Sequence, residues 1–120
     1  MNDQTIEQEI ITKGKVAPRV TPADIESNIV QTHYFTAADG CHCVYQGGPE
    51  FQATDKALDL LTFCVLVLRN GFTVTGESAC ASPENFDAEI GRKIARDNAV
   101  AKIWPLLGFS LKQKLHEAAK

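Results

Sequence analysis

Two extended runs joined by Asn70-Gly71 constrain the fold of this chain more than any other feature of its sequence. The first run, residues 61–69, reads LTFCVLVLR, and the second, residues 72–79, reads FTVTGESA. Asn-Gly between such runs is the strongest short hairpin signal, because a type I′ turn needs positive φ at both central residues. The sequence therefore predicts an antiparallel hairpin with a two-residue loop.

A two-residue loop fixes which side chains share each face of the hairpin. It places Val67 opposite Val74, and the predicted core face then consists of Phe63, Val65, Val67, Phe72 and Val74. The other face carries two leucines beside two threonines, namely Leu66, Leu68, Thr73 and Thr75. A contiguous apolar patch favours self-association. We therefore expect a homo-oligomer, specifically a two-fold dimer, with this second face as its interface.

Helical signals precede the hairpin. Thr21 is a good N-cap and Pro22 a good first helical residue, so a helix is predicted from there to about Tyr34 or Phe35. Residues 36–55 are rich in glycine and small polar residues and predict a loop, with residues 43–45 as a third short strand.

A long helix is predicted after the hairpin, from about residue 87 to residue 107, because apolar side chains recur there at helical spacing. Pro105 should kink or end it, Gly108 should reinforce the break, and a short terminal helix should follow. The fold class is therefore α+β, a hairpin packed against a long C-terminal helix and an N-terminal helix. Residues 1–19 are expected to be a mobile leader and residues 20–120 a single domain.

The charge and hydropathy of the chain exclude some classes of protein. A net charge of −3 lacks the basic balance usual in proteins that rely on phosphate neutralisation, although a local basic patch remains open. No apolar run approaches the roughly 18 residues of a membrane span. The N-terminus has no basic start followed by an apolar block. We expect the protein to stay in the cytoplasm of the cell that makes it, with free thiols.

Gly76-Glu77-Ser78-Ala79-Cys80 is one residue short of G-x-S-x-G, the turn that presents the nucleophilic serine of α/β-hydrolases. That turn needs a parallel strand feeding directly into a helix, whereas Ser78 lies on the second arm of a hairpin. We interpret Ser78 as a small structural residue and expect no enzyme.

Metal binding is a second alternative. Cys41-His42-Cys43 with a further His or Cys could supply four zinc ligands, but C-x-C lacks the usual spacing and no second paired element completes a site. Cys80 and His33 could form a nucleophilic pair, yet no third orienting residue can be named. We expect no metal and no cofactor.

The predicted strand-turn-strand and basic helix resemble the second half of double-stranded-RNA-binding domains, which read phosphates with lysines at the start of that helix. The basic residues here are Arg92, Lys93, Arg96 and Lys102. The start of the helix instead carries Glu84, Asp87 and Glu89, which would repel phosphate. RNA binding is therefore not favoured.

Residues 20–115 resemble a family of small phage and prophage proteins known by its founding genes, gene forty-nine of a coliphage and gene sixty-six of a Shigella phage. The most specific pieces are LRNGFTVTGESAC, PENFD and GRKIA, with TPADIESNIVQTHYFTAADG before them. The resemblance implies a phage-encoded accessory protein. It brings no established activity and no catalytic residues.

Two classes of function follow. The first is a non-enzymatic binding protein of the host-takeover or counter-defence type, which captures a host protein or a signalling nucleotide. The alternative is a nucleic-acid-associated protein that uses the basic side of the long helix. A ligand site would lie where the turn after the hairpin meets that helix, at Glu77, Ser78, Asn85, Arg92 and Arg96. The alternative that this segment only packs strand against helix stays open.

Overall fold

The computed structural model describes residues 2–45 and 56–120. The α-helices are α1 (Asp3–Thr12), α2 (Pro22–Asn28), α3 (Ala37–Tyr45), α4 (Ala88–Ala101) and α5 (Ile103–Ala118). The strands are β1 (Ile29–Thr36), β2 (Leu61–Leu68) and β3 (Thr73–Ala79), and two short 3₁₀ helices are η1 (Lys56–Leu60) and η2 (Pro83–Asn85).

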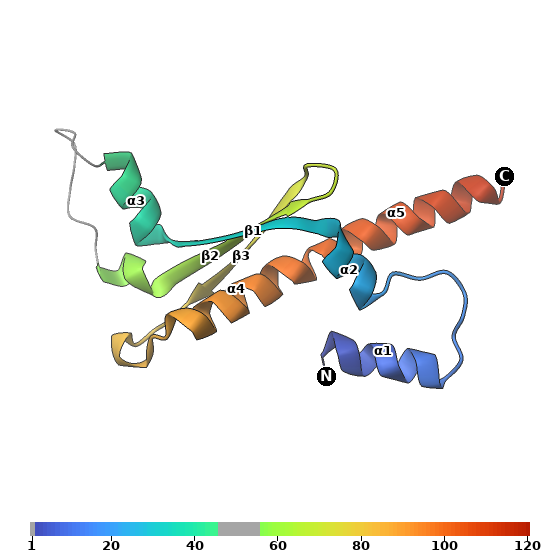
Figure 1. Ribbon diagram of the computed structural model, residues 1–120, viewed down its shortest axis with the longest axis horizontal. Helices are drawn as coiled ribbons and strands as arrows, with labels where there is room; N and C mark the ends of the chain where they lie inside the picture. Colours follow the sequence, from blue (N-terminus) through green and yellow to red (C-terminus); the bar gives the residue numbers. More distant parts are fainter. Residues whose placement is uncertain (1, 46–55) are drawn as a thin grey trace.

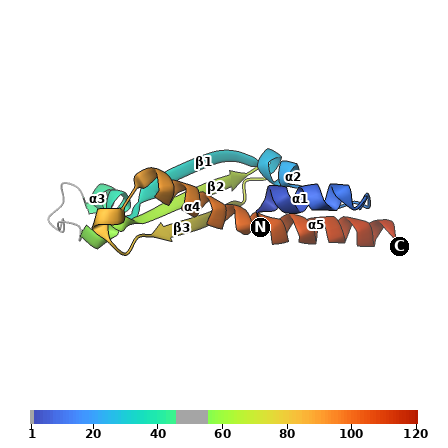
Figure 2. The same cartoon turned by 90° about the horizontal axis from the view of Figure 1, so that it is seen from below.

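The strands form one antiparallel sheet in the order β1-β2-β3, and α4 lies across one face of it (Figure 1). Helices α4 and α5 run end to end along the long axis of the molecule (Figures 1 and 2). The predicted α+β class and the hairpin of β2 and β3 are therefore confirmed.

The predicted two-residue turn is wrong, because three residues, 69–71, connect the strands. The Leu68 amide donates to the Phe72 carbonyl over 2.8 Å, and the Gly71 amide donates to the Leu68 carbonyl over 2.9 Å. Gly71 has φ +89°, whereas Asn70 is outside the positive-φ region. The Asn70 side chain instead accepts from the Phe72 amide. This is a type I turn followed by a left-handed glycine, the usual three-residue hairpin loop.

The extra loop residue moves the register by one and exchanges the partners across the hairpin. Leu66 lies opposite Val74 and Val65 opposite Thr75. Leu66 and Leu68 are 0% and 4% exposed, so their predicted place on a free face is wrong. The predicted core residues Phe63, Val65, Val67 and Phe72 point away from α4 or lie at the loop, while Val74 is buried as predicted.

Helix α4 packs against the inner face of the sheet through small residues. Ala95 and Ala99 are fully buried, and Ile103 of α5 continues the same row. Opposite them, Gly76 leaves no room for a side chain, since a Cβ there would lie 2.1 Å from the Ala95 carbonyl oxygen. The core of the domain is this contact between α4 and the buried residues of β2 and β3.

The predicted N-terminal helix begins as expected but ends early. Thr21 caps α2 in a capping box with Asp24, with hydrogen bonds of 3.1 and 2.9 Å. The helix ends at Asn28, and β1 follows without a loop. The sequence IVQTHYFT is rich in β-branched and aromatic residues, which favour a strand, and pairing with β2 satisfies its backbone.

The third strand is therefore β1, and the strand predicted at residues 43–45 is wrong because these residues end α3. The predicted loop is partly replaced by α3, and its remainder, residues 46–55, lies outside the described residues.

The break in the C-terminal helix lies three residues before Pro105. Proline has no amide hydrogen to donate to the Ala101 carbonyl, and its ring crowds that group, so α4 ends at Ala101 and Pro105 occupies the first turn of α5. The predicted effect of Pro105 is confirmed. Gly108 does not break the chain direction, because α5 continues through it to Ala118.

Residues 3–12 form α1, a helix that the sequence analysis did not predict. It contributes no buried residue. Two polar contacts hold it to the rest of the chain: Asp3 accepts a hydrogen bond from the Trp104 indole, and Glu7 pairs with Arg19.

Candidate functional site

The five residues predicted to bind a ligand do not lie together. Arg92 and Arg96 line one hollow with Tyr34, on the side of α4 that faces β1. Glu77 and Ser78 lie on β3, at the other edge of the sheet, with Glu77 pointing away from α4. Asn85 is exposed in η2. Two of the five are thus brought together, one helical turn apart.

Two amides in the first turn of α4 are already taken by a carboxylate of the chain itself. Asp87 is its N-cap, and the Asp87 carboxylate accepts from the amides of Glu89 and Ile90 over 2.9 and 3.1 Å. A bound anion would have to displace this carboxylate. The anion site predicted at this helix start is therefore not supported.

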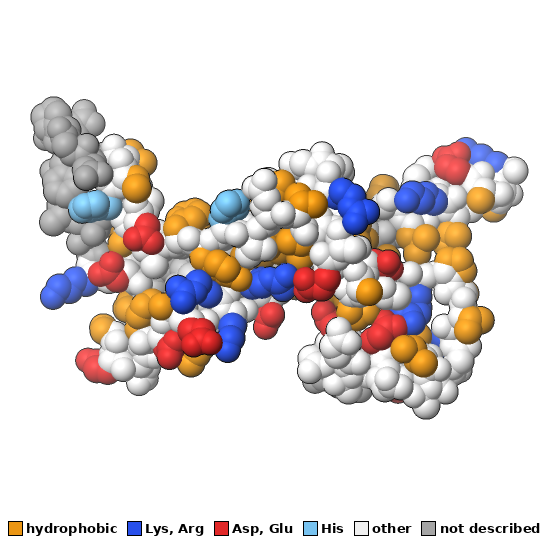
Figure 3. Space-filling model, in the orientation of Figure 1, with side chains coloured by type: hydrophobic (Ala, Val, Ile, Leu, Met, Phe, Trp, Pro, Cys, Tyr) orange, Lys and Arg blue, Asp and Glu red, His pale blue; other side chains and the backbone are white. Residues whose placement is uncertain are grey.

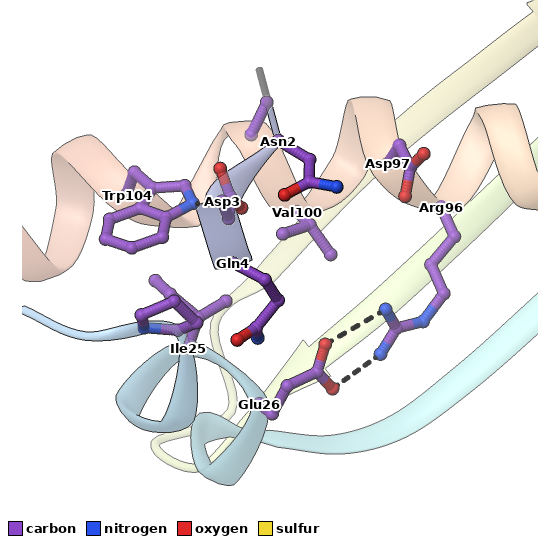
Figure 4. A pocket seen from close by; sticks show the side chains of 11 residues that line it. Asn2, Asp3, Gln4, Ile25, Glu26, Arg96, Asp97, Val100 and Trp104 are labelled. Atoms are coloured by element: carbon purple, nitrogen blue, oxygen red, sulfur yellow. Dashed lines mark hydrogen bonds and ion pairs between the residues drawn. The ribbon is translucent and has the colours of Figure 1, made fainter. Parts of the chain in front are cut away.

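A groove does run along the β1 side of α4. It consists of two adjoining hollows of about 480 and 500 Å³ that share Arg96 and Asp97. One hollow lies beside Tyr34 and Arg92. The other, shown in Figure 4, lies between α1, α2 and the junction of α4 with α5, and its walls include Asn2, Asp3, Ile25, Glu26, Val100 and Trp104. We call the two hollows together the α4 groove.

The α4 groove carries charges of both signs, and its central cation is already paired. Arg96 donates two hydrogen bonds to the Glu26 carboxylate, of 3.2 and 2.8 Å (Figure 4). The hydrogen bond to Glu26 raises the pKa of Arg96, and burial opposes it. Lys93 pairs with Glu89 at 3.3 Å. These pairs leave little net positive charge for a phosphate.

Sequence reasoning missed Tyr34 and Trp104, the aromatic residues of the groove. Tyr34 was assigned to the end of a helix but lies on β1, and burial raises the pKa of its hydroxyl. The Trp104 indole Nε1 donates to the Asp3 carboxylate over 3.1 Å, between residues 101 positions apart. Only the strand-like composition of residues 29–36 could have indicated the position of Tyr34. No local sequence pattern indicates the contact between Trp104 and Asp3.

The surroundings of Ser78 agree with a structural role. Ser78 is half-buried on an antiparallel strand, opposite Thr62. Eight residues, including η2, separate this strand from α4, whereas a nucleophile elbow turns directly from strand to helix.

The cysteines lie in different environments. Cys41 and Cys43 are on α3, Cys64 is fully buried under α4, and the Cys80 thiol donates to the Ser82 carbonyl over 3.2 Å. All four are free thiols. Within residues 2–45 and 56–120, no group of three or more His, Cys, Asp and Glu side chains lies close enough to hold a metal ion.

The thiols should therefore react with iodoacetamide at very different rates. Burial raises the pKa of the Cys64 thiol, which the nearby Arg96 only partly offsets, so near pH 8 Cys64 stays protonated as well as inaccessible. Cys43 is exposed and should be alkylated first. Mass spectrometry of a time course should show Cys64 labelled only after urea unfolds the protein. Equal rates for Cys43 and Cys64 in the native protein would contradict this burial.

The face of the sheet turned away from α4 is a second candidate site. On β2, buried and half-buried residues alternate without interruption, and the half-buried set includes Phe63, Val65 and Val67. Phe35 of β1 lies beside Phe63, with ring centroids 5.6 Å apart. Thr73 and Thr75 of β3 complete this surface and are exposed. We call these six residues the outer sheet face.

The outer sheet face is unusually apolar for a surface of this kind. Antiparallel sheets with one wet face normally carry polar residues there, whereas the central strand here presents one phenylalanine and two valines. Helix α4 packs on the inner face of β2, and α3 and η1 lie beside its first residues. None of these described helices covers Val65 and Val67.

Comparison with known proteins places the chain in a family. In the part of the chain that the structure describes, no helix has the length and apolar character needed to span a membrane. Neither the curated proteins nor the solved structures contain a match to the chain. A family model matches residues 20–115, from just before the cap of α2 to the last turns of α5. The chain therefore belongs to the Phage protein (N4 Gp49/phage Sf6 gene 66) family.

Proposed function

We propose that this phage protein is a non-enzymatic binding protein of the host-takeover or counter-defence type, acting in the host cytoplasm, and that it binds a host protein through the outer sheet face. The observation that carries the proposal is the apolar surface formed by Phe35, Phe63, Val65 and Val67. Helix α4 packs on the opposite face of the sheet, and α3 and η1 do not reach Val65 and Val67. Apolar surface of this kind marks protein interaction sites in soluble proteins.

A host protein fits this chain better than a signalling nucleotide. A nucleotide needs cations that are free to meet its phosphates, and in the α4 groove Arg96 and Lys93 are paired with Glu26 and Glu89. The same pairing weakens the nucleic-acid alternative. The basic residues in and just after α4 are Arg92, Lys93, Arg96 and Lys102. Lys93 and Arg96 form ion pairs within the protein, and Asp97 and Glu89 lie beside Arg92.

The partner should present an apolar and largely uncharged surface. The charged or titratable side chains at the margin of the outer sheet face are His33 on β1 and Glu77 on β3. Recognition would therefore depend on apolar contact more than on ion pairs, and it should persist at high salt. Nucleic-acid binding would instead weaken steeply with salt.

The test compares capture from a lysate of the host bacterium by three tagged chains, the wild type, Val67→Lys and Ile94→Lys. Val67 lies on the outer sheet face, and Ile94 is an exposed apolar residue of α4 on the other side of the sheet. The wild type and Ile94→Lys should capture the same host protein in 0.5 M salt. Val67→Lys should lose at least about tenfold, since a charge at the centre of an apolar contact is strongly unfavourable.

Equal capture by all three chains, or by none, would contradict the proposal. Far-UV circular dichroism of Val67→Lys must match that of the wild type, so that loss of capture cannot come from unfolding. If Val67→Lys instead lowers the mass of the free protein in light scattering, the outer sheet face joins two copies of this chain.

A further inference from the structure

Helix α5 extends beyond the domain that supports it. Of its 16 residues, Ile103 alone is buried. Its far half projects past the sheet in both views (Figures 1 and 2). A lone helix of this length is marginal in water. If the apolar side of α5 is not buried within its own chain, a partner is therefore needed to bury it and stabilise the helix.

The molecule exposes more surface than a compact monomer. Its radius of gyration is 18.8 Å, against about 13.6 Å for a compact domain of this length. Its accessible surface is 8512 Å², about 2,100 Å² more than the roughly 6,400 Å² expected for this mass. A standard interface covers about 800 Å² on each partner. The excess is ample for one interface between two copies.

One side of α5 has a regular apolar seam. Trp104, Gly108, Leu111 and Leu115 fall within a sector of about 60° at 3.6 residues per turn. Trp104 and Leu111 are half-buried, and Leu115 is 40% exposed. Trp104 faces α1, so the seam looks into the hollow between α1 and α5. Hydrophobic side chains gather along this side of α5 in Figure 3.

The spacing of the seam is the same in both directions, four, three and four residues. Two antiparallel copies of α5 related by a two-fold axis would therefore bring all four positions into register at once. Each Gly108 would meet a Leu111, and each Trp104 a Leu115. From this symmetry we propose that the chain forms a two-fold dimer in which the two α5 helices pack antiparallel along this seam.

Gly108 is explained by such a dimer and not by the single chain. Glycine inside a helix weakens it relative to alanine. Within one chain a Cβ at Gly108 would meet no atom within 4 Å, so no internal contact requires glycine. In the dimer, the missing side chain makes room for Leu111 of the second copy.

An apolar cleft that could receive a side chain of the second copy lies beside the first turn of α5. A cavity of about 240 Å³ lies between α1 and Trp104, lined by apolar side chains including Ile6, Ile10, Val20 and Pro22. Leu115 of the second copy would reach this cleft beside Trp104. Lys112 and Lys114 of that copy would lie beside Asp3 of α1, whose carboxylate otherwise accepts from the neutral Trp104 indole, whereas Glu7 is already paired with Arg19. Shape and charge therefore both favour a second copy as the occupant.

Light scattering of the full chain from 1 to 100 µM tests the dimer. The mass should be twice the 13.1 kDa of one chain. Gly108→Glu should raise the dissociation constant about thirtyfold or more, although within one chain a Cβ at this position meets no atom within 4 Å. Gln113→Glu, on the opposite side of α5, should leave the constant within about threefold of wild type, because that side chain faces away from the seam.

Mixing two variants tests the register itself. Gly108→Lys and Leu111→Glu should each be monomeric, but an equimolar mixture should form heterodimers, since one contact becomes Lys against Glu and the other stays wild type. Gly108→Lys mixed with Leu111→Lys should not associate. A monomeric wild type at 100 µM, a dimer that Gly108→Glu does not weaken, or a mixture that stays monomeric would overturn the proposal. Circular dichroism confirms that each variant stays folded.

Discussion

Replacing Gly76 with alanine should unfold the protein or leave it barely stable. The added Cβ would lie 2.1 Å from the Ala95 carbonyl oxygen and 2.3 Å from the Ala99 amide nitrogen. Both are backbone atoms of α4, which cannot rotate out of the way as a side chain can. Helix α4 would have to move off β3, and its contact with the sheet is the core of the domain. We expect a loss of about 3 kcal/mol or more, measured by urea unfolding.

Gly40→Ala is the matched control. Gly40 is in α3, and a Cβ there would meet the Phe35 ring at 3.9 Å, an ordinary contact. Because alanine favours a helix over glycine, this variant should be neutral or gain up to about 1 kcal/mol. If Gly76→Ala is as stable as wild type, α4 does not pack on β3 as described. In the Gly76-Glu77-Ser78 sequence, we thus expect stability to depend on the glycine and not on the serine.

The hairpin shows both what sequence can predict and where it fails. The two β-rich runs around Asn70-Gly71 were enough to predict the strands and the antiparallel pairing. The exact turn depended on a competition that composition does not resolve. Asn70 could take positive φ, as a type I′ turn requires, or accept the Phe72 amide with its side chain. The second outcome adds one residue to the loop and turns every side chain of one strand to the other face.

The predictions for the elements outside the hairpin failed for a different reason. Thr21 and Pro22 correctly predicted the start of a helix, because capping is local. The end of that helix at Asn28 is set by the pairing of β1 with β2, whose paired residues are 26 to 39 positions apart in the chain. Helix α1 is tied to Trp104 and Arg19 by side-chain contacts that have no local signature.

The same difference between local signals and long-range contacts applies to the candidate sites. Arg92 and Arg96 are one turn apart on a helix, so their common side was predictable, and they do line one hollow. Their placement opposite Tyr34 and Glu26 required knowledge of where β1 and α2 lie. The outer sheet face could be identified only after the register was known. The sequence placed Thr73 and Thr75 on one face with Leu66 and Leu68, whereas in the structure the two threonines share their face with Phe63, Val65 and Val67.

Leu66→Lys should unfold the chain, and Val67→Lys should not. Leu66 is 0% exposed and packs in the core with Val74 and α4, so lysine there would bury an unpaired charge or expose the core to water. The expected loss is about 4 kcal/mol or more, a large part of the total stability of a small domain. Val67 is the next residue on the same strand but points to the outer sheet face. Its lysine can extend into solvent, and the expected loss is about 1 kcal/mol or less.

This pair of variants separates the two registers of the hairpin directly. With a two-residue turn, Val67 would be core and Leu66 surface, so Val67→Lys would unfold the chain and Leu66→Lys would stay folded. With the three-residue loop closed by Gly71, the order is reversed. Thermal and urea unfolding followed by circular dichroism distinguishes the outcomes without knowledge of any binding partner. Both substitutions place the same side chain at adjacent positions of one strand, so net charge changes equally, and the main difference is the direction in which the side chain points.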